Sequence, residues 1–385
     1  MTGNSGMDAG VGRMGSISPR SPRNPGRALV ALSGGVDSAV AAALLVDRGY
    51  EVVGVMLRLW AEKAGRNSSS NRCCTSDAVS RARRVADQLH IPFHLVDVES
   101  AFKDHVVDYF VSEYRVGRTP NPCVCCNRAI RFGLLLKRAL AWGADFLATG
   151  HYARVRCVDG CYQLLRGQDV SKDQSYFLHT LNQEQLARVL FPLGELTKDE
   201  VRDLARQRGL PVAEQPESQD ICFVADDDYR HFLARCAPHL FRPGPICDVA
   251  GRVLGQHEGL PAYTIGQRKG LGIAAQEPLY VLAIDTAENA LVVGPADELG
   301  QDECLLQNVH YVDGKVPSSP FQAMAQIRYR APAVPVKVTP LPHRSGCVYF
   351  ASVQRDITPG QFLVLYQGEV VLGGGTICKT LRPVL

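Results

Sequence analysis

The sequence has no long hydrophobic run. No stretch of the 385-residue chain approaches the ~20 apolar residues that a membrane-spanning helix requires. Residues 1–26 are mainly Gly, Ser, Pro and Arg, and they lack the apolar segment of a secretory signal. We therefore expect no membrane partner and a disordered tail over residues 1–26.

The chain also lacks a strong charge of either sign and an even set of cysteines. Its net charge is only +3, which is too small to indicate a nucleic-acid partner by itself. Its 13 cysteines are an odd number scattered through a long chain, unlike the disulfide framework of a small secreted domain. These features favour reduced thiols and a cytoplasmic location.

Two nucleotide- and metal-binding patterns are missing as well. No G-x-x-x-x-G-K-[ST] sequence occurs, so the lysine that reaches the β- and γ-phosphates in an ordinary P-loop is absent. A closed zinc site usually needs four ligands, and no second C-x-x-C accompanies Cys123-x-x-Cys126.

What the sequence does contain is a glycine turn between an apolar run and an alanine-rich helical run. Glycines here can direct backbone N–H groups at an anion, and the helix N-terminus adds its positive dipole end. Asp37 can hold a magnesium ion that screens phosphate charge. We predict that this turn binds ATP, grasping pyrophosphate as a leaving group, through Ala31, Leu32, Ser33, Gly34, Gly35, Val36, Asp37 and Ser38.

Apolar runs alternate with helical patterns up to about residue 225, which predicts a parallel sheet covered on both faces. Ligands of such sheets bind at the carboxyl ends of the strands. Met56 ends the run that follows the glycine turn, and Gly150 and His151 follow the run 146–149. We expect these positions to face the same nucleotide, although a methionine at a strand end is more often a core residue.

Three cysteines lie close together in the segment Arg118–Asn127. Because Pro120 and Pro122 disfavour regular structure, we expect Cys123, Cys125 and Cys126 on a stiff loop before a helix over 130–142. Nearby arginines and the helix N-terminus should lower the pKa of these thiols. A reactive cysteine, a metal ligand and a buried thiol all remain open for them.

The remaining motifs are weaker when taken singly. Asp159-Gly160 predicts a hairpin, and Thr197-Lys-Asp-Glu200 predicts a capping box with a structural role only. The segment Lys172–Ser175 is either a solvated turn or an RNA contact. Cys222, between polar and apolar residues, is by itself more typical of a buried thiol than of a catalytic one.

Short β-branched runs recur beyond residue 279, which predicts a small closed antiparallel domain. Arg328, Tyr329 and Arg330 combine basic and aromatic character within the predicted strand 321–330, as contact with phosphates and stacking on bases require, although an isolated basic strand edge is more often simply solvated. We expect a tail at 1–26, an α/β catalytic domain at 27–225, a small α+β central domain at 226–278, and a β-barrel at 279–385.

The segment 33–38 resembles the pyrophosphatase loop shared by ATP enzymes that adenylate a substrate oxygen. Several motifs in order then resemble the bacterial tRNA-specific 2-thiouridylase family over nearly the whole chain after the tail. They lie at residues 33–38, 117–127, 148–151, 172–177, 220–223, 266–272 and 358–361. The resemblance implies an adenine-nucleotide α-hydrolase-like domain, a central domain and a C-terminal barrel.

The activity that this resemblance implies is ATP-dependent 2-thiolation of the wobble uridine of tRNA. The uridine O2 would be adenylated, with ATP and Mg²⁺ as cofactors, and sulfur would then come from a cysteine persulfide. Cys222 would carry the persulfide and Cys126 would be the partner nucleophile, with a disulfide between them left to be reduced. A cysteine desulfurase or a sulfur-relay protein would donate the sulfur.

The resemblance also implies which residues meet the RNA. Three positions would contact the target base: Asn121, Pro122 and Cys123. Seven positions would contact the rest of the tRNA: His151, Lys172, Asp173, Gln174, Arg328, Tyr329 and Gln361.

Cys123 departs from the family pattern, in which many members carry an aspartate that is thought to handle protons. The change places Cys123, Cys126 and Cys222 as three thiols that could hold a [4Fe–4S] cluster, as in some related thiolases. Three alternatives therefore stay open: thiolation through such a cluster, a non-thiolating adenylating ligase with the same loop, and a tRNA-binding or sulfur-relay protein that does not turn over ATP.

Overall fold

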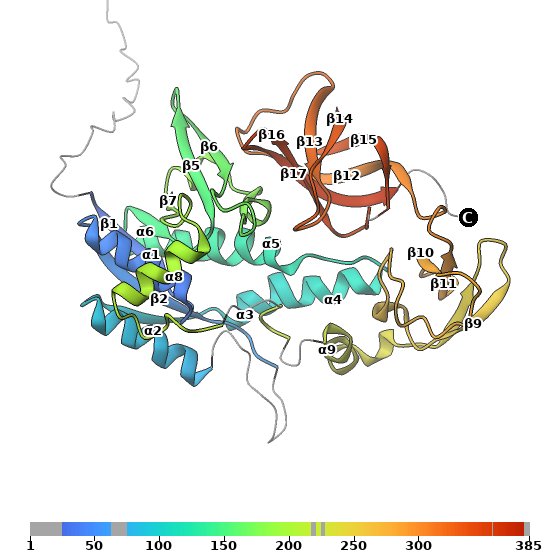
Figure 1. Ribbon diagram of the computed structural model, residues 1–385, viewed down its shortest axis with the longest axis horizontal. Helices are drawn as coiled ribbons and strands as arrows, with labels where there is room; N and C mark the ends of the chain where they lie inside the picture. The colour runs from blue at the N-terminus through green and yellow to red at the C-terminus, as the bar shows by residue number, and fades with distance from the viewer. Residues whose placement is uncertain (1–24, 63–74, 217–220, 225–227, 356, 381–385) are drawn as a thin grey trace, which may run out of the picture.

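The computed structural model describes residues 25–62, 75–216, 221–224, 228–355 and 357–380. The predicted tail therefore lies almost entirely outside the described residues. Three sheets organise the chain, with the parallel sheet at one end of the long axis and the β-barrel and a small sheet towards the other (Figure 1). Within the part of the chain that the structure describes, no helix has the length and apolar character to cross a bilayer.

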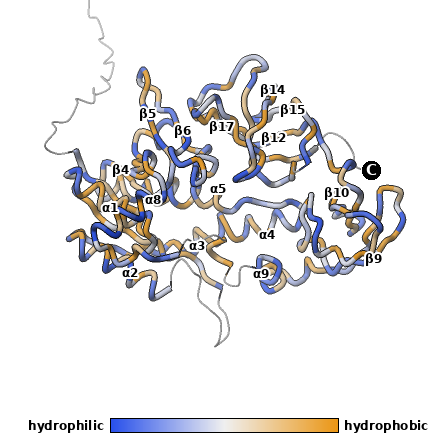
Figure 2. The backbone as a smooth tube through the Cα atoms, in the orientation of Figure 1, coloured by the Kyte–Doolittle hydropathy of each residue, from blue (hydrophilic) through white to orange (hydrophobic). Residues whose placement is uncertain are grey.

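The first sheet has five parallel strands, as the alternating pattern predicts. Its order is β3-β2-β1-β4-β7. The strands are β1 (Arg27–Ala31), β2 (Glu51–Arg58), β3 (Phe93–Asp97), β4 (Phe146–Ala148) and β7 (Val189–Leu190). The interior of this sheet and its first helix stand out as hydrophobic in Figure 2.

Helices cover both faces of this sheet because successive residues of β1 point to opposite sides. Ala28 and Val30 pack with α1 (Val36–Asp47) and α2 (Ser76–Gln88) on one face. Leu29 packs on the other face. The helices that contribute to this second cluster include α3 (Glu99–Phe102), a π-helical turn (Lys103–Val107), α4 (Asp108–Arg115), and the helix that begins at Pro122.

The strand order reverses between β1 and β4, because β2 and β3 extend the sheet on one side and β4 and β7 on the other. This is the topological switch point at which ligands bind to open α/β sheets. The glycine turn follows β1, and Gly150 follows β4. The fold therefore brings both predicted ATP-binding segments to this point.

The prediction of an irregular cysteine loop was wrong. One continuous helical rod runs through α5 (Pro122–Cys126), a π-helical stretch (Asn127–Leu135) and α6 (Leu136–Ala141). Pro122 is the first residue of α5, where its missing N–H costs no hydrogen bond and its fixed φ suits a helix. The Asn121 side chain accepts a hydrogen bond from the Val124 N–H, at 3.4 Å, and caps the helix.

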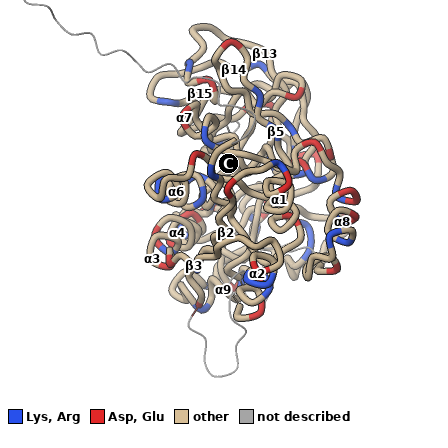
Figure 3. The backbone as a smooth tube through the Cα atoms, turned by 90° about the vertical axis from the view of Figure 1, so that its left-hand side faces the viewer, with Lys and Arg blue, Asp and Glu red and all other residues tan. Residues whose placement is uncertain are grey.

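Residues 153–212 complete the first domain and connect it to the barrel. The predicted hairpin is confirmed as β5 (Ala153–Val158) and β6 (Cys161–Arg166), with Asp159 and Gly160 at positive φ. Next come a 3₁₀ turn (Ser175–Leu178), α7 (Gln183–Leu186) and α8 (Lys198–Gln207). At the end of the molecule that holds the parallel sheet, Lys and Arg are interspersed with Asp and Glu (Figure 3).

The predicted closed antiparallel barrel is present, but it begins later than expected. Its order is β12-β15-β14-β13-β16-β17, and a β12–β17 pairing closes it. The strands are β12 (Gln301–Tyr311), β13 (Phe321–Gln326), β14 (Val334–Leu341), β15 (Ser345–Gln354), β16 (Phe362–Gln367) and β17 (Val370–Thr380). Strand β6 pairs with β17 and joins the catalytic domain to the barrel.

Two strands that we expected in the barrel belong to the central sheet, so the structure does not support a boundary at residue 279. Its order is β10-β11-β8-β9. The elements are α9 (Tyr229–Cys236), 3₁₀ turns (Pro238–Leu240 and Leu260–Ala262), β8 (Gly244–Cys247), β9 (Val253–His257), β10 (Tyr280–Asp285) and β11 (Ala290–Gly294). Strand β11 runs parallel to β8, a pairing between distant segments that local sequence patterns do not encode.

The segment Arg328–Arg330 is a turn and not part of a strand. Strand β13 ends at Gln326, and the Ala331 N–H donates to the Arg328 carbonyl at 3.1 Å. Arg330 has a φ of 67°. Pro332 follows, and it has no N–H to continue a ladder.

Candidate active site

The glycine turn between β1 and α1 is held by its own serines. The Ser33 N–H donates to the Ser38 Oγ at 3.1 Å, and the Gly35 N–H donates to the Ser33 Oγ at 3.4 Å. Gly34 has a φ of +74°, and a Cβ there would lie 2.6 Å from the Ala78 carbonyl oxygen. This position therefore requires glycine, and the turn has the compact form of an anion-binding cradle at a helix N-terminus.

Gly150 lies directly against this cradle. A Cβ at this position would lie 2.8 Å from both the Asp37 carbonyl carbon and the Ser38 nitrogen. The structure thus brings these two predicted ATP-binding segments together. Met56 differs, since its side chain is 1% exposed and belongs to the core between the sheet and α2.

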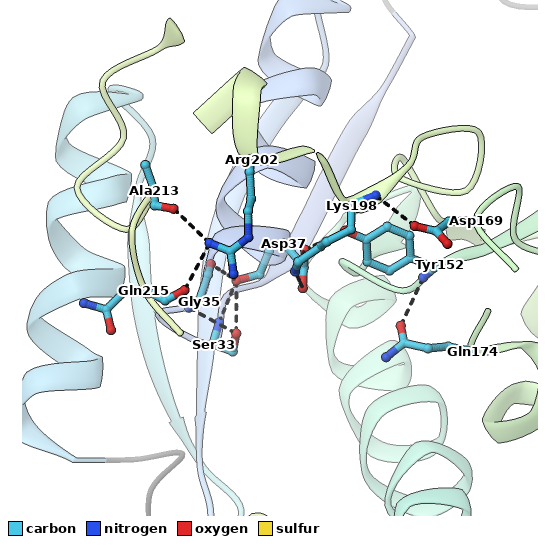
Figure 4. A network of polar contacts seen from close by, with 11 residues as sticks. Ser33, Gly35, Asp37, Tyr152, Asp169, Gln174, Lys198, Arg202, Ala213 and Gln215 are labelled. Atoms are coloured by element: carbon cyan, nitrogen blue, oxygen red, sulfur yellow. Dashed lines mark hydrogen bonds and ion pairs between the residues drawn. The ribbon is translucent and has the colours of Figure 1, made fainter. Parts of the chain in front are cut away.

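Lys198 is a site residue that sequence reasoning missed. Its Nζ donates to both carboxylate oxygens of Asp37, at 2.7 and 2.8 Å, from 161 residues further along the chain (Figure 4). The Tyr152 hydroxyl donates to the same carboxylate at 2.8 Å. The Lys198 ammonium group therefore places a positive charge at the loop, although the sequence lacks the P-loop pattern that would predict one.

The capping box at the start of α8 explains how Lys198 is placed. The box is present, because the Thr197 side chain accepts from the Glu200 N–H while the Glu200 carboxylate accepts from the Thr197 N–H. The Lys198 N–H donates to the Asp169 carboxylate at 3.0 Å. The sequence predicts only a structural role for this motif, and nothing local in it indicates that its second residue points at Asp37.

Two arginines secure the surroundings of the loop. Arg81 of α2 donates from Nε to the Gly34 carbonyl at 3.2 Å. Arg202 of α8 donates from Nη1 to the Ala213 and Gln215 carbonyls, at 3.3 and 3.4 Å, with its side chain directed towards the loop in Figure 4. Neither residue was predicted from the sequence.

The helix α5 separates its three thiols by exposure. Cys123 is exposed, whereas Cys125 and Cys126 are buried. Burial raises the pKa of Cys125 to about 12, although the charge of Arg128 and a hydrogen bond with the Tyr109 hydroxyl act in the opposite direction. The expected lowering of the pKa is therefore wrong for Cys125, which is a structural thiol.

Cys222 contacts the same hydrophobic cluster. It is half-buried and packs against the cluster that contains Cys126. Its neighbour Phe223 anchors it by edge-to-face contacts with Phe102 and Phe110, at ring centroid distances of 5.8 and 5.4 Å. Residues 217–220, which precede Cys222 in the predicted motif, lie outside the described residues.

Two of the residues predicted to contact tRNA are buried. His151 is 8% exposed and shares a 2.7 Å hydrogen bond with the Thr149 hydroxyl; burial, with a contribution from Arg131, lowers its pKa to about 3. Asp173 is 9% exposed, and its carboxylate accepts hydrogen bonds from Arg166 and Ser175. Both side chains are buried and make hydrogen bonds within the protein. Their contact with RNA remains a prediction.

Four other predicted tRNA contacts are half-buried and partly engaged. The Gln174 side chain accepts from the Tyr152 N–H at 3.1 Å. Tyr329 packs on Phe177 at a centroid distance of 4.3 Å. The Lys172 N–H donates to the Asp169 carbonyl at 3.0 Å. Arg328 reaches the central domain, where it donates to a backbone carbonyl.

The proposed cluster ligands do not form a metal site. Among the described residues, which include Cys123, Cys126 and Cys222, no group of three or more His, Cys, Asp or Glu side chains is placed to hold a metal ion. The donor set therefore does not fit a [4Fe–4S] cluster in this arrangement. Asp37 offers a carboxylate at the loop, which suffices where Mg²⁺ is held mainly by substrate phosphates.

Comparison with known proteins gives consistent matches over all three parts of the chain. The family model described as tRNA methyl transferase HUP domain matches residues 26–226. The tRNA methyl transferase PRC-barrel domain matches residues 230–295, and the Aminomethyltransferase beta-barrel domain matches residues 301–377.

Curated relatives match over nearly their whole length. The tRNA-specific 2-thiouridylase MnmA of Magnetococcus marinus is 52% identical over 92% of this chain and 99% of its own. The enzymes of the same name from Roseiflexus castenholzii and Moorella thermoacetica are each 50% identical over 91% of this chain, and over 99% and 98% of their own lengths. Identity of this extent shows that the chain belongs to the tRNA-specific 2-thiouridylase family.

Proposed function

We propose that this chain is an ATP-dependent tRNA-uridine 2-sulfurtransferase. It converts the wobble uridine of tRNA to 2-thiouridine and releases AMP and pyrophosphate. The observation that carries this proposal is the combination of a phosphate cradle at the sheet switch point with two thiols, Cys126 and Cys222, on one hydrophobic cluster. The relatives named 2-thiouridylase support the same activity.

The loop and its lysine supply the activation half of the reaction. The segment 31–38 would bind the phosphates of ATP through its N–H groups and hydroxyls, with Gly150 and the end of β2 beside the nucleotide. Asp37 would hold Mg²⁺, which supplies Lewis-acid screening of phosphate charge when bound. Lys198, now paired with Asp37, would provide the cation that the missing P-loop lysine supplies elsewhere.

The thiols supply the sulfur-transfer half. The uridine O2 attacks the ATP α-phosphorus and pyrophosphate leaves, which turns a poor leaving group into AMP. The terminal sulfur of a Cys222 persulfide attacks C2, and AMP departs. The Cys126 thiolate then attacks the inner sulfur of Cys222, so that the S–S bond breaks, 2-thiouridine is released and a Cys126–Cys222 disulfide forms. A thiol reductant restores both residues.

Partners follow from this scheme. A cysteine desulfurase or a sulfur-relay protein would load Cys222 with its terminal sulfur. Asn121, Pro122 and Cys123 would lie against the target base, and the exposed position of Cys123 is consistent with that place. The tRNA would extend over the catalytic domain and the barrel.

The persulfide route is favoured over the cluster route because the described cysteines are not grouped as metal ligands. A non-thiolating ligase would need neither Cys126 nor Cys222. That alternative is disfavoured because both thiols are present on one hydrophobic cluster. The relay alternative is disfavoured by the intact cradle, with Lys198 poised on Asp37.

Mass spectrometry of tRNA nucleosides tests the proposal. Unmodified tRNA is incubated with ATP, a persulfide-generating desulfurase and the full-length chain, and 2-thiouridine is measured. We expect product from the wild type and from the control Cys125→Ala, but none from Cys126→Ala or Cys222→Ala. Unchanged product in either of the last two variants would refute the sulfur path, and loss of activity on iron chelation would favour the cluster.

A further inference from the structure

The segment between α4 and α5 is held by the barrel before it reaches the thiols. The Thr119 N–H donates to the Pro359 carbonyl at 2.9 Å. The Gln361 Nε2 donates to the carbonyls of Thr119 and Pro120, at 2.8 and 3.3 Å, across 242 and 241 residues of chain. Figure 1 shows this segment running beneath the barrel on its way from α4 to α5.

Glycines make this contact close. Gly360 has a φ of +93°, and a Cβ there would lie 2.9 Å from the Arg118 Cβ and from the Thr119 nitrogen. Gly117 has a φ of +71°, and its Cβ would lie 2.9 Å from the Thr286 Cγ2. The barrel on one side and the central domain on the other therefore leave the segment little room to shift.

The central domain also contacts both this segment and the barrel. The hydroxyls of Thr119 and Thr264 are 3.3 Å apart. Arg328 of the barrel donates to the Ile265 carbonyl at 3.2 Å and to the Thr358 hydroxyl. All three domains thus meet at the residues that lead into α5.

We infer that Gln361 is a positioning residue that fixes the Thr119–Pro120 backbone, and through the Asn121 cap the helix that carries Cys123 and Cys126. This inference deepens the proposed function and rests on it. It differs from the role that the family resemblance implies, in which Gln361 contacts tRNA. Its amide donor is already used on two carbonyls, so its effect passes through the thiol helix.

Such a role predicts a particular kinetic pattern. A shift of about 1 Å in a catalytic group lowers rates by up to about 100-fold without needing any change in binding. Loss of a clamp also lets the covered segment open more often, which exposes buried groups to reagents. Replacing Gln361 should therefore lower kcat and speed alkylation of Cys126, while the Kd for tRNA stays nearly constant.

The experiment uses the full-length chain with Gln361→Ala, and Gln322→Ala as the matched control, because Gln322 is exposed on β13 of the same barrel. Single-turnover thiolation, equilibrium tRNA binding and the rate of iodoacetamide reaction at Cys126 are measured for each. For Gln361→Ala we expect a loss in rate of roughly 10-fold or more, faster alkylation, and a Kd within about 2-fold of the wild type.

Other results would overturn the inference. A Kd weakened by about 10-fold with unchanged alkylation would make Gln361 a tRNA contact, and wild-type behaviour in all three measurements would leave it no role. If Gln361→Ala does not fold, Thr119→Val removes the hydroxyl contact with Thr264, and the same pattern is expected at smaller size. Alkylation of Cys126 does not depend on catalytic activity. If the wild type proves inactive, the proposed function is refuted, but the alkylation rates of the wild type and Gln361→Ala still test whether Gln361 holds the segment in place.

Discussion

Lys198 shows how a single residue can restore a group that a motif lacks. The cradle has no lysine of its own, yet an ammonium group reaches both oxygens of Asp37 from the first turn of α8. The pair is only partly open to solvent, with the Lys198 side chain 9% exposed and that of Asp37 35% exposed. A charge held this way is available to phosphates with little reorganisation.

Lys198→Met should therefore weaken ATP binding. Loss of one charge-assisted hydrogen bond, worth about 1.5–3 kcal/mol, corresponds to a rise in Kd of roughly 10- to 150-fold. Lys198→Arg should keep part of the affinity. Calorimetric titration with a non-hydrolysable ATP analogue and Mg²⁺ measures this, with Lys137→Met on the exposed side of α6 as control; an unchanged Kd for Lys198→Met would exclude a phosphate-binding role.

At the same scale, the cysteines show the limit of charge-based reasoning. Neighbouring arginines predicted lowered pKa values for the thiols of α5. For Cys125 burial outweighs them, because desolvation disfavours the thiolate more than Arg128 favours it. The helical conformation of α5 sets the direction in which each of the three thiols points. That direction decides which thiol is buried and therefore unreactive.

At the scale of elements, the start of α5 decides where the thiols lie. Asn121 accepts from the Val124 N–H, and Pro122 occupies the first helical position. The sequence Pro-Asn-Pro predicts a break in regular structure, whereas the second proline begins a helix. The same pair of residues would therefore serve both helix formation and contact with the target base.

Asn121→Ala should destabilise the fold by about 1 kcal/mol through loss of this cap, and it should also lower thiolation. Asn121→Asp retains the acceptor and should recover the stability. The comparison is Asn182→Ala, which removes the cap of α7 and should cost similar stability without affecting thiolation. Urea unfolding and product formation measure the two effects; equal activity of both alanine variants would argue against a role for Asn121 beyond capping.

At the scale of the whole molecule, the barrel docks on the catalytic domain through buried polar contacts. The Tyr176 hydroxyl donates to the Phe362 carbonyl at 2.9 Å. The His310 Nε2 is hydrogen-bonded to the Leu181 carbonyl at 2.9 Å. His179 is 1% exposed, and its Nδ1 must carry a proton because it faces the Tyr176 carbonyl at 2.8 Å. The interface is built with neutral imidazoles.

Stability should consequently fall as the pH drops below about 6.5, the value for an unfolded histidine. Burial lowers the pKa of His179 to about 4 and that of His151 to about 3, so near pH 5 the unfolded chain binds protons at both positions and the folded chain does not. Each histidine then costs about 2 kcal/mol between pH 7.5 and pH 5.

Urea unfolding of His179→Gln at pH 7.5 and pH 5 tests this. The loss of stability between the two pH values should shrink by about 2 kcal/mol relative to the wild type. His239→Gln, on an exposed residue, should leave the pH dependence as it is. An identical pH dependence in His179→Gln would show that this imidazole does not stay neutral in the fold.

The sequence by itself determined the local features of this protein. The parallel sheet, the cradle at residues 33–38, the Asp159-Gly160 hairpin, the cap at Thr197, and the closed barrel all follow from periodicity, glycine placement and capping chemistry, which act over a few residues. The family resemblance supplied Cys126 and Cys222.

Only the tertiary structure decided which distant groups meet. The pairing of Lys198 with Asp37, the hold of Gln361 on Thr119, the place of β10 and β11 in the central sheet, and the burial of Cys125 all join segments whose separation along the chain carries no local pattern. Such contacts depend on how the three domains pack. The phosphate cradle is therefore visible in the sequence, while the lysine that completes it is visible only in the fold.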